Sequence, residues 1–156
     1  MRLNETDLVR WGRSIGQDIE PPVVIALEGP LGAGKSVLAR AIGQGAGVEA
    51  PMPSPTFNLL LRYELPSGGA VVHLDLYRIS EPDEVWELGW AELGSRPEIV
   101  LVEWPEQAEA LMPEDHWRVR LAVTPGDRRL RDVEVQRVGA PHPLPGFPMT
   151  LARGER

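Results

Sequence analysis

A short glycine-rich segment contains the residues of this sequence that are best suited to chemistry. It reads "EGPLGAGKSVLAR" from Glu28 to Arg40 and includes Lys35, the single lysine of a chain whose other basic side chains are arginines. The stretch from Gly29 to Ser36 fits the pattern G-x-x-x-x-G-K-[ST], in which backbone N–H groups and the positive end of a helix surround an anion. The pattern predicts a phosphate-binding loop.

Each polar residue of this loop has a chemical reason to be there. A lysine is a compact charge on a flexible stem that reaches between two phosphates, where the planar fork of arginine would sit differently. The hydroxyl of Ser36 is an oxygen ligand for Mg²⁺. A glycine-rich turn that matches by accident is the alternative, which the apolar strand before the loop and the helix after it disfavour. The residues expected to contact ATP are Gly29, Leu31, Gly32, Ala33, Gly34, Lys35, Ser36 and Val37.

Two apolar runs end in a carboxylate. "VVHLDLY" presents Asp75 and "IVLVEW" presents Glu103, and the ends of such strands meet at the edge of a sheet beside the phosphate site. Either carboxylate could hold Mg²⁺ through water or polarise an attacking water. Pairing with an arginine such as Arg78 is the structural alternative for each. The sequence leaves these roles open.

Three further residues have two interpretations each. Thr56, in "PSPTFNLL", either senses the γ-phosphate and magnesium or caps the following strand. His73 shares a strand face with Asp75 and either packs or forms a hydrogen bond. Trp104 either borders the nucleotide or belongs to the core.

The elements that must position these residues alternate between strands and helices. We expect an amphipathic helix over residues 4–19, a buried strand over 23–29, a helix over 36–46 and a hairpin of 57–63 with 70–77. A helix from Ser80 to Leu88, a strand over 98–104, a short helix over 105–112 and strands beginning at Trp117 and Leu130 follow. The fold class is α/β: a mixed sheet flanked by helices in three layers, like that of P-loop NTPases.

Composition limits the kind of protein this is. The 156 residues predict one domain over 1–137 and a proline-rich, flexible tail over 138–156. The net charge of −7 disfavours a broad nucleic-acid footprint, so any nucleic acid is expected to be held by a partner. With no cysteine, no apolar run of membrane-spanning length and a polar N-terminus, we expect a cytoplasmic protein without membrane contact.

One exclusion concerns the base of the nucleotide. Ras-type GTPases read guanine with an N-K-x-D motif, and Lys35 is the only lysine here, so adenine is favoured. Asp75 begins "DLYR" and therefore not the D-x-x-G motif of those GTPases.

Five segments together resemble a known family. "LEGPLGAGKS", "SPTFNLLLRYE", "HLDLYR", the following "ELG" and "LVEWPE" are similar in order and spacing to TsaE, a family of bacterial ATPases, over roughly residues 4–137. The resemblance implies ATP hydrolysis in threonylcarbamoyladenosine modification of tRNA, with the partners TsaD and TsaB carrying the transfer chemistry. Hydrolysis would reset that complex, and tRNA would be met only through the partners.

The resemblance also implies roles for individual residues. Ser36 and Glu103 would bind magnesium, Asp75 and Thr56 would be needed for hydrolysis together with Lys35, and Trp104 would lie near the nucleotide. From the arginine-rich segment 128–131 we add Arg129 to the expected nucleotide contacts. Two departures are visible: Pro30 stands where the family usually has aspartate, and Ser36, which keeps the hydroxyl, where it usually has threonine.

Two other functions share a phosphate-binding loop. A small-molecule kinase could use "RRLR" (128–131) as lid arginines, although these lie among apparent strand residues and no acceptor pocket is evident. A non-hydrolysing regulator would bind nucleotide only, and the intact set of Lys35, Ser36 and Glu103 speaks against it.

Overall fold

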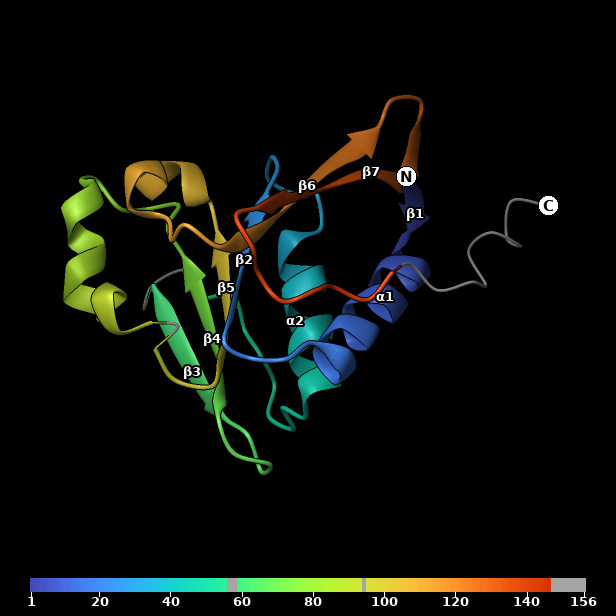
Figure 1. The fold of residues 1–156 in the computed structure, drawn as a ribbon. Coiled ribbons are helices and arrows are strands. Elements are labelled where there is room, and N and C mark those ends of the chain that lie inside the picture. The colour runs from blue at the N-terminus through green and yellow to red at the C-terminus, as the bar shows by residue number, and fades with distance from the viewer. Residues whose placement is uncertain (56–58, 94, 147–156) are drawn as a thin grey trace.

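A mixed seven-stranded sheet forms the centre of the molecule (Figure 1). The computed structural model describes residues 1–55, 59–93 and 95–146. The strand order is β1-β7-β6-β2-β5-β4-β3. The parallel strands are β2 (Val23–Glu28), β4 (Ala70–Asp75), β5 (Glu98–Glu103) and β6 (His116–Thr124). The antiparallel strands are β1 (Arg2–Asn4), β3 (Leu60–Glu64) and β7 (Asp127–Val138).

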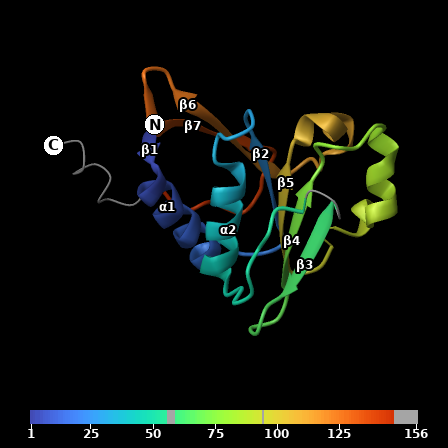
Figure 2. The same ribbon diagram turned by 180° about the vertical axis from the view of Figure 1, so that it is seen from behind.

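Helices cover both faces of this sheet, and the view from behind shows the same separation (Figure 2). One face carries α1 (Glu5–Asp18) and α2 (Lys35–Ala46). The other carries three short 3₁₀ helices, η1 (Pro82–Leu88), η2 (Trp90–Glu92) and η3 (Pro105–Leu111). The predicted three-layer α/β architecture is therefore confirmed. Within the described ranges, no helix is long and apolar enough to cross a membrane.

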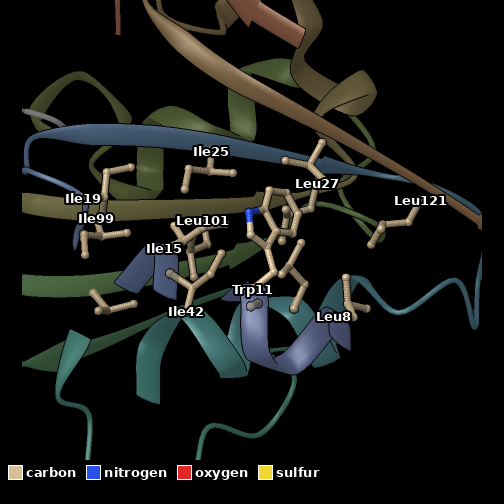
Figure 3. Packing of buried hydrophobic residues seen from close by; sticks show 14 of the residues in the cluster. Leu8, Trp11, Ile15, Ile19, Ile25, Leu27, Ile42, Ile99, Leu101 and Leu121 are labelled. Atoms are coloured by element: carbon tan, nitrogen blue, oxygen red, sulfur yellow. The ribbon is translucent and has the colours of Figure 1, made fainter. Parts of the chain in front are cut away.

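The larger core lies between the sheet and the two α-helices. Asn4 caps α1 by accepting a hydrogen bond from the backbone N–H of Asp7 at 2.8 Å. Apolar residues at helical spacing then point from α1 toward β2 (Figure 3), with Leu8, Trp11, Ile15, Ile25 and Leu27 at most 1% exposed. The core thus fixes the end of β2, where the predicted phosphate-binding loop begins.

Several predicted elements differ from the observed ones in detail. The helix expected from Ser80 is a 3₁₀ helix that begins at Pro82, and its capping box joins Glu81 to Glu84. The spacing of Ser80 and Asp83, a serine followed three residues later by an acid, predicts a capping box one residue earlier. The sequence does not predict β1, because three residues are too few to show a periodic pattern. This strand is recognised by its pairing with β7.

The first part of the predicted tail contacts the domain. Trp117 donates its indole N–H to the carbonyl of His142 at 2.6 Å, and Trp11 donates to the carbonyl of Pro145 at 3.3 Å. Leu144 packs against the main core cluster. These contacts hold residues 142–145 against the domain, on the tail side of the predicted boundary at 137. Residues 147–156 lie outside the described residues, so for them a flexible tail stays a prediction.

Helices α1 and α2 pack closely because glycines lie at their contact. A Cβ added to Gly16 would lie 2.0 Å from the carbonyl oxygen of Ile42 and 2.6 Å from the backbone nitrogen of Ala46. Backbone atoms cannot yield as a flexible side chain would, so the whole helix would have to shift.

We therefore expect Gly16→Ala to lower the free energy of unfolding by about 1–3 kcal/mol, the usual cost of overpacking. The sign is informative because alanine ordinarily stabilises a helix by roughly 0.5–1 kcal/mol relative to glycine. Urea denaturation measures the difference. Gln17→Ala, at an exposed site one residue on, is the control and should change stability by less than about 0.5 kcal/mol. A Gly16→Ala variant as stable as the wild type would contradict the close packing.

An ion-pair network joins the last residue of β2 to β6. Glu28 accepts hydrogen bonds from Arg118 and, at 2.9 Å, from Arg120, and Arg118 also contacts Glu109. Burial alone would raise the pKa of Glu28, but the two guanidinium groups outweigh it and hold that pKa below its ordinary value. The network stabilises the end of β2, where the predicted phosphate-binding loop begins.

Glu28→Gln should destabilise the protein by about 1–3 kcal/mol at neutral pH, because two arginines lose a charged acceptor. The pKa of Glu28 is depressed in the folded state, so its contribution is present above about pH 4.5, its ordinary pKa, and is lost as pH falls through the lower folded value. Denaturation curves of both proteins between pH 7 and about pH 3 should therefore converge in acid. Glu134→Gln, which removes the exposed partner of Arg120, is the matched control and should cost at most about 1 kcal/mol. A Glu28→Gln deficit that persists unchanged in acid would refute the ion-pair explanation.

Candidate functional site

The predicted phosphate-binding loop connects β2 to α2. Gly29 opens it with a φ of 144°, and a Cβ there would lie 2.2 Å from the carbonyl oxygen of Leu121, so only glycine fits. Gly34 is the N-cap of α2 with a φ of 107° and supplies no side-chain hydrogen bond. The first turn of α2 therefore lacks a side-chain cap and has its positive dipole end directed at the loop. Such an arrangement favours an anion.

Lys35 is the first residue of α2, and its ammonium group lies inside the loop. Its Nζ donates to the carbonyl oxygens of Gly29 and, at 3.0 Å, Pro30. The same nitrogen lies 4.0 Å from the centroid of the Trp104 ring, a cation–π contact. Burial lowers the pKa of Lys35, and nearby carboxylates, that of Glu103 foremost, counteract the effect only in part. The loop thus contains a positioned cation.

Ser36 and Glu103 meet beside that cation. The Ser36 hydroxyl lies 3.1 Å and 3.2 Å from the two carboxylate oxygens of Glu103, the last residue of β5. The Glu103 side chain is only 3% exposed, and it also contacts His73 Nε2 at 2.5 Å. A hydroxyl and a carboxylate are hard oxygen donors of the kind that Mg²⁺ prefers. These two residues could therefore hold a magnesium ion together.

Asp75 lies next to Glu103 across the sheet. The two residues are paired in register on β4 and β5 and project toward the same face. Burial raises the pKa of Asp75, and the Glu103 carboxylate adds to the rise. The backbone N–H of Tyr77 opposes it by donating to Asp75 at 3.0 Å. The sheet edge thus presents two neighbouring carboxylates, and Asp75 has a raised pKa.

A cavity of about 430 Å³ brings most of the predicted residues together. Tyr77 and Trp104 form part of its wall, with ring centroids 4.8 Å apart. Trp104 has a left-handed backbone conformation, φ 60°, immediately before η3. The predicted residues that line the cavity are Leu31, Gly32, Gly34, Lys35, Ser36, Val37, Asp75, Glu103 and Trp104. Gly29 and Ala33 belong to the loop but are not part of the lining.

Arg131 lines this cavity although the sequence interpretation does not select it. From β7 its guanidinium donates to the loop carbonyls of Ala33, at 3.0 Å, and Gly32, at 3.3 Å. Arg129, the arginine chosen from the sequence, pairs with Asp127 and lines an adjoining cavity instead. The alternation of β7 could have suggested Arg131 as a second choice, since residues two apart share a face.

One predicted site residue remains, and one cavity residue was not predicted. Thr56 lies outside the described residues, so its two interpretations stay predictions. Ser54, two residues earlier, lines the cavity and was not selected from the sequence. Among described residues, no cluster of three or more His, Cys, Asp or Glu side chains could hold a metal ion alone.

Comparison with known proteins identifies the family of this chain. The family model of "Threonylcarbamoyl adenosine biosynthesis protein TsaE" matches residues 3–131. The tRNA threonylcarbamoyladenosine biosynthesis protein TsaE of Haemophilus influenzae is 32% identical over 116 residues, covering 71% of this chain and 73% of the relative. That of Mycobacterium bovis is 37% identical over 132 residues, covering 80% and 79%.

The fold also has a solved counterpart. The crystal structure of Bacillus subtilis YdiB is similar with a TM-score of 0.71 at 24% identity, covering 89% of this chain and 84% of the other. That likeness concerns the fold alone. The family assignment rests on the match to residues 3–131 and on relatives more than 30% identical over most of the chain. This chain belongs to the TsaE family of threonylcarbamoyl adenosine biosynthesis proteins.

Proposed function

We propose that this chain binds ATP with Mg²⁺ and hydrolyses it as the ATPase component of tRNA threonylcarbamoyladenosine modification. One observation carries the proposal: Lys35, Ser36 and Glu103 meet at the start of α2, where the helix has no side-chain cap. A phosphate–magnesium pair requires a cation, a hydroxyl and a carboxylate. The positive end of the uncapped helix favours the phosphate as well.

Phosphate binding follows from the loop. The backbone of residues 29–34 and the first turn of α2 would supply N–H donors to the phosphate oxygens. The ammonium group of Lys35, which here contacts two loop carbonyls and the Trp104 ring, would turn to the β- and γ-phosphates. Arg131, anchored on the carbonyls of Gly32 and Ala33, would hold the loop in shape and add positive charge at the rim.

Magnesium fits the residues that are present. Ser36 and Glu103 offer oxygen ligands, and no described cluster of three or more potential ligands competes for the ion. Mg²⁺ is usually held by one or two protein ligands together with waters and substrate phosphates. Ser36 and Glu103 would be such a pair of ligands. When bound, the ion would neutralise charge on the phosphates.

The carboxylates take different roles in this proposal. The contact of Glu103 with the Ser36 hydroxyl supports Glu103 on the magnesium side. Asp75, one strand further on, would accept a hydrogen bond from the attacking water and orient it toward the γ-phosphate. Its raised pKa suits a group that takes part in proton movement better than a permanently charged ligand.

The remainder of the nucleotide would occupy a second cavity. This space of about 460 Å³ adjoins the first, because both are lined by Gly34, Val37 and Arg131. Its opposite wall comes from the start of α1 and includes Asn4, Glu5 and Thr6, while Arg129 closes it from β7. Base and ribose could therefore lie between α1 and the β6–β7 hairpin, with adenine favoured by the absence of a guanine-reading lysine.

The partners in this proposal are TsaD and TsaB, which would carry the transfer chemistry while ATP hydrolysis here resets the complex. The net charge of −7 supports contact with tRNA only through them. Leu31 at the tip of the loop is 71% exposed and Tyr77 beside the site is 44% exposed, which leaves apolar surface for a partner at the mouth of the nucleotide site.

Replacing Lys35 tests the nucleotide site. Lys35→Ala should weaken ATP binding, measured by calorimetry, by roughly 100-fold or more, because charge-assisted hydrogen bonds worth ~1.5–3 kcal/mol each are lost. Lys35→Arg should recover little, since the planar fork does not match the reach of an ammonium. Arg40→Ala, which removes a positive charge later in the same helix, is the control and should bind normally. ATP turnover with TsaD and TsaB present should follow binding, and full turnover by the Lys35→Ala variant would refute the proposal.

Separate substitutions distinguish the two carboxylates. Glu103→Ala should weaken nucleotide binding only when Mg²⁺ is present, because a hard cation loses an oxygen ligand. Asp75→Ala should leave affinity within a few fold while turnover falls by about two orders of magnitude, the scale of a positioned base. Glu106→Ala removes a neighbouring negative charge and should change neither property strongly. The roles are exchanged if Asp75→Ala loses the magnesium effect and Glu103→Ala keeps it.

A further inference from the structure

His73 is a buried polar residue that the proposed reaction does not yet use. It lies near the end of β4 with an exposed fraction of 0%. By strand alternation its side chain faces the same side of the sheet as Asp75. Histidine at such a position is either a packing residue or a hydrogen-bonding residue, and its contacts decide between the two.

The contacts of His73 lead to the candidate magnesium ligand. Nε2 lies 2.5 Å from Oε2 of Glu103. An ionised carboxylate can only accept, so Nε2 must carry the hydrogen and donate it. The other ring nitrogen, Nδ1, is buried without a hydrogen-bond partner among the described residues. Within the described residues, the polar contact of the ring is therefore the one between Nε2 and Glu103.

The two oxygens of Glu103 have different surroundings as a result. Oε2 contacts both His73 Nε2, at 2.5 Å, and the Ser36 hydroxyl, at 3.2 Å, whereas Oε1 lies 3.1 Å from the Ser36 hydroxyl alone. A buried carboxylate without a donor is costly, and a glutamate has three side-chain torsions through which it could turn away. A donor on Oε2 restrains these torsions and keeps the carboxylate beside Ser36.

We propose that His73 is a positioning residue that holds the Glu103 carboxylate in the orientation needed to bind magnesium with Ser36. This role rests on the proposed function, because it has a purpose only if Glu103 meets a metal ion. Hydrogen-bond partners of metal ligands commonly fix ligand orientation in this way, and their loss costs about 10- to 100-fold in metal affinity or activity.

Magnesium-dependent nucleotide affinity tests the role without relying on turnover. Calorimetry with ATP, in EDTA and in excess Mg²⁺, gives the factor by which magnesium strengthens binding. His73→Leu should reduce that factor by about 10-fold or more and leave affinity in EDTA nearly unchanged. His73→Gln should restore most of it, since the glutamine amide nitrogen is the same number of bonds from Cβ as Nε2. His116→Leu is the matched control: that histidine is also buried, but it contacts the carbonyl of Pro113, away from the site.

A double-mutant cycle separates positioning from general stability. In a Glu103→Ala background, His73→Leu should have no further effect on the magnesium factor, whereas a merely structural role would weaken binding equally in both backgrounds. A His73→Leu protein with the wild-type factor overturns this inference alone. A wild-type protein whose nucleotide binding ignores magnesium overturns the proposed function and this role together.

The tautomer of His73 provides a readout that needs no nucleotide. In ¹⁵N NMR spectra of the free protein, His73 should carry its hydrogen on Nε2, with the signal assigned by its disappearance in His73→Gln. Glu103→Ala should shift that signal, because the acceptor is lost, and the signal of His116 should stay in place. An Nδ1–H tautomer in the wild type would overturn the inference whatever the binding data show.

Discussion

The parallel register of β2, β5 and β4 is the constraint on which the site depends. Glu103 pairs with Leu27 on one side and with Asp75 on the other, so these strands end at nearly the same level. The loop that leaves β2 must therefore turn into α2 directly above two carboxylates. If β5 were displaced by one residue, its alternation would turn Glu103 to the opposite face, away from Ser36. Buried apolar strands specify this register, and the chemistry at their ends follows from it.

The charges at this sheet edge are unbalanced, which supports the proposed magnesium ion. Lys35 faces two buried carboxylates, and Glu106 adds a third negative charge to its surroundings. An approaching triphosphate brings more negative charge toward the same place, which costs free energy in a buried setting. A divalent cation between phosphate and carboxylate removes that conflict. In the proposed function, the acidic edge and the cationic loop would therefore suit a metal–nucleotide pair better than the nucleotide alone.

Local signals allowed much of this site to be predicted from the sequence. The loop and α2 follow from contiguous residues, and the rule that parallel strands end at one edge placed Asp75 beside Glu103. Alternation along β7 puts Arg129 and Arg131 on one face, and only the fold shows that Arg131 contacts the loop while Arg129 pairs with Asp127. The contact between His73 and Glu103 likewise depends on the diagonal distance between two strands, which sequence spacing does not contain.

The use of a single lysine in this chain also has a structural explanation. Elsewhere arginines bridge carboxylates with their forked guanidinium groups, as Arg118 does between Glu28 and Glu109. Inside the loop, the compact ammonium of Lys35 contacts two carbonyls and an aromatic ring, and in the proposed function it would exchange these neighbours for phosphate oxygens. Arginine therefore suits the bridges between carboxylates, and lysine suits the position where, in the proposed function, a cation would change partners.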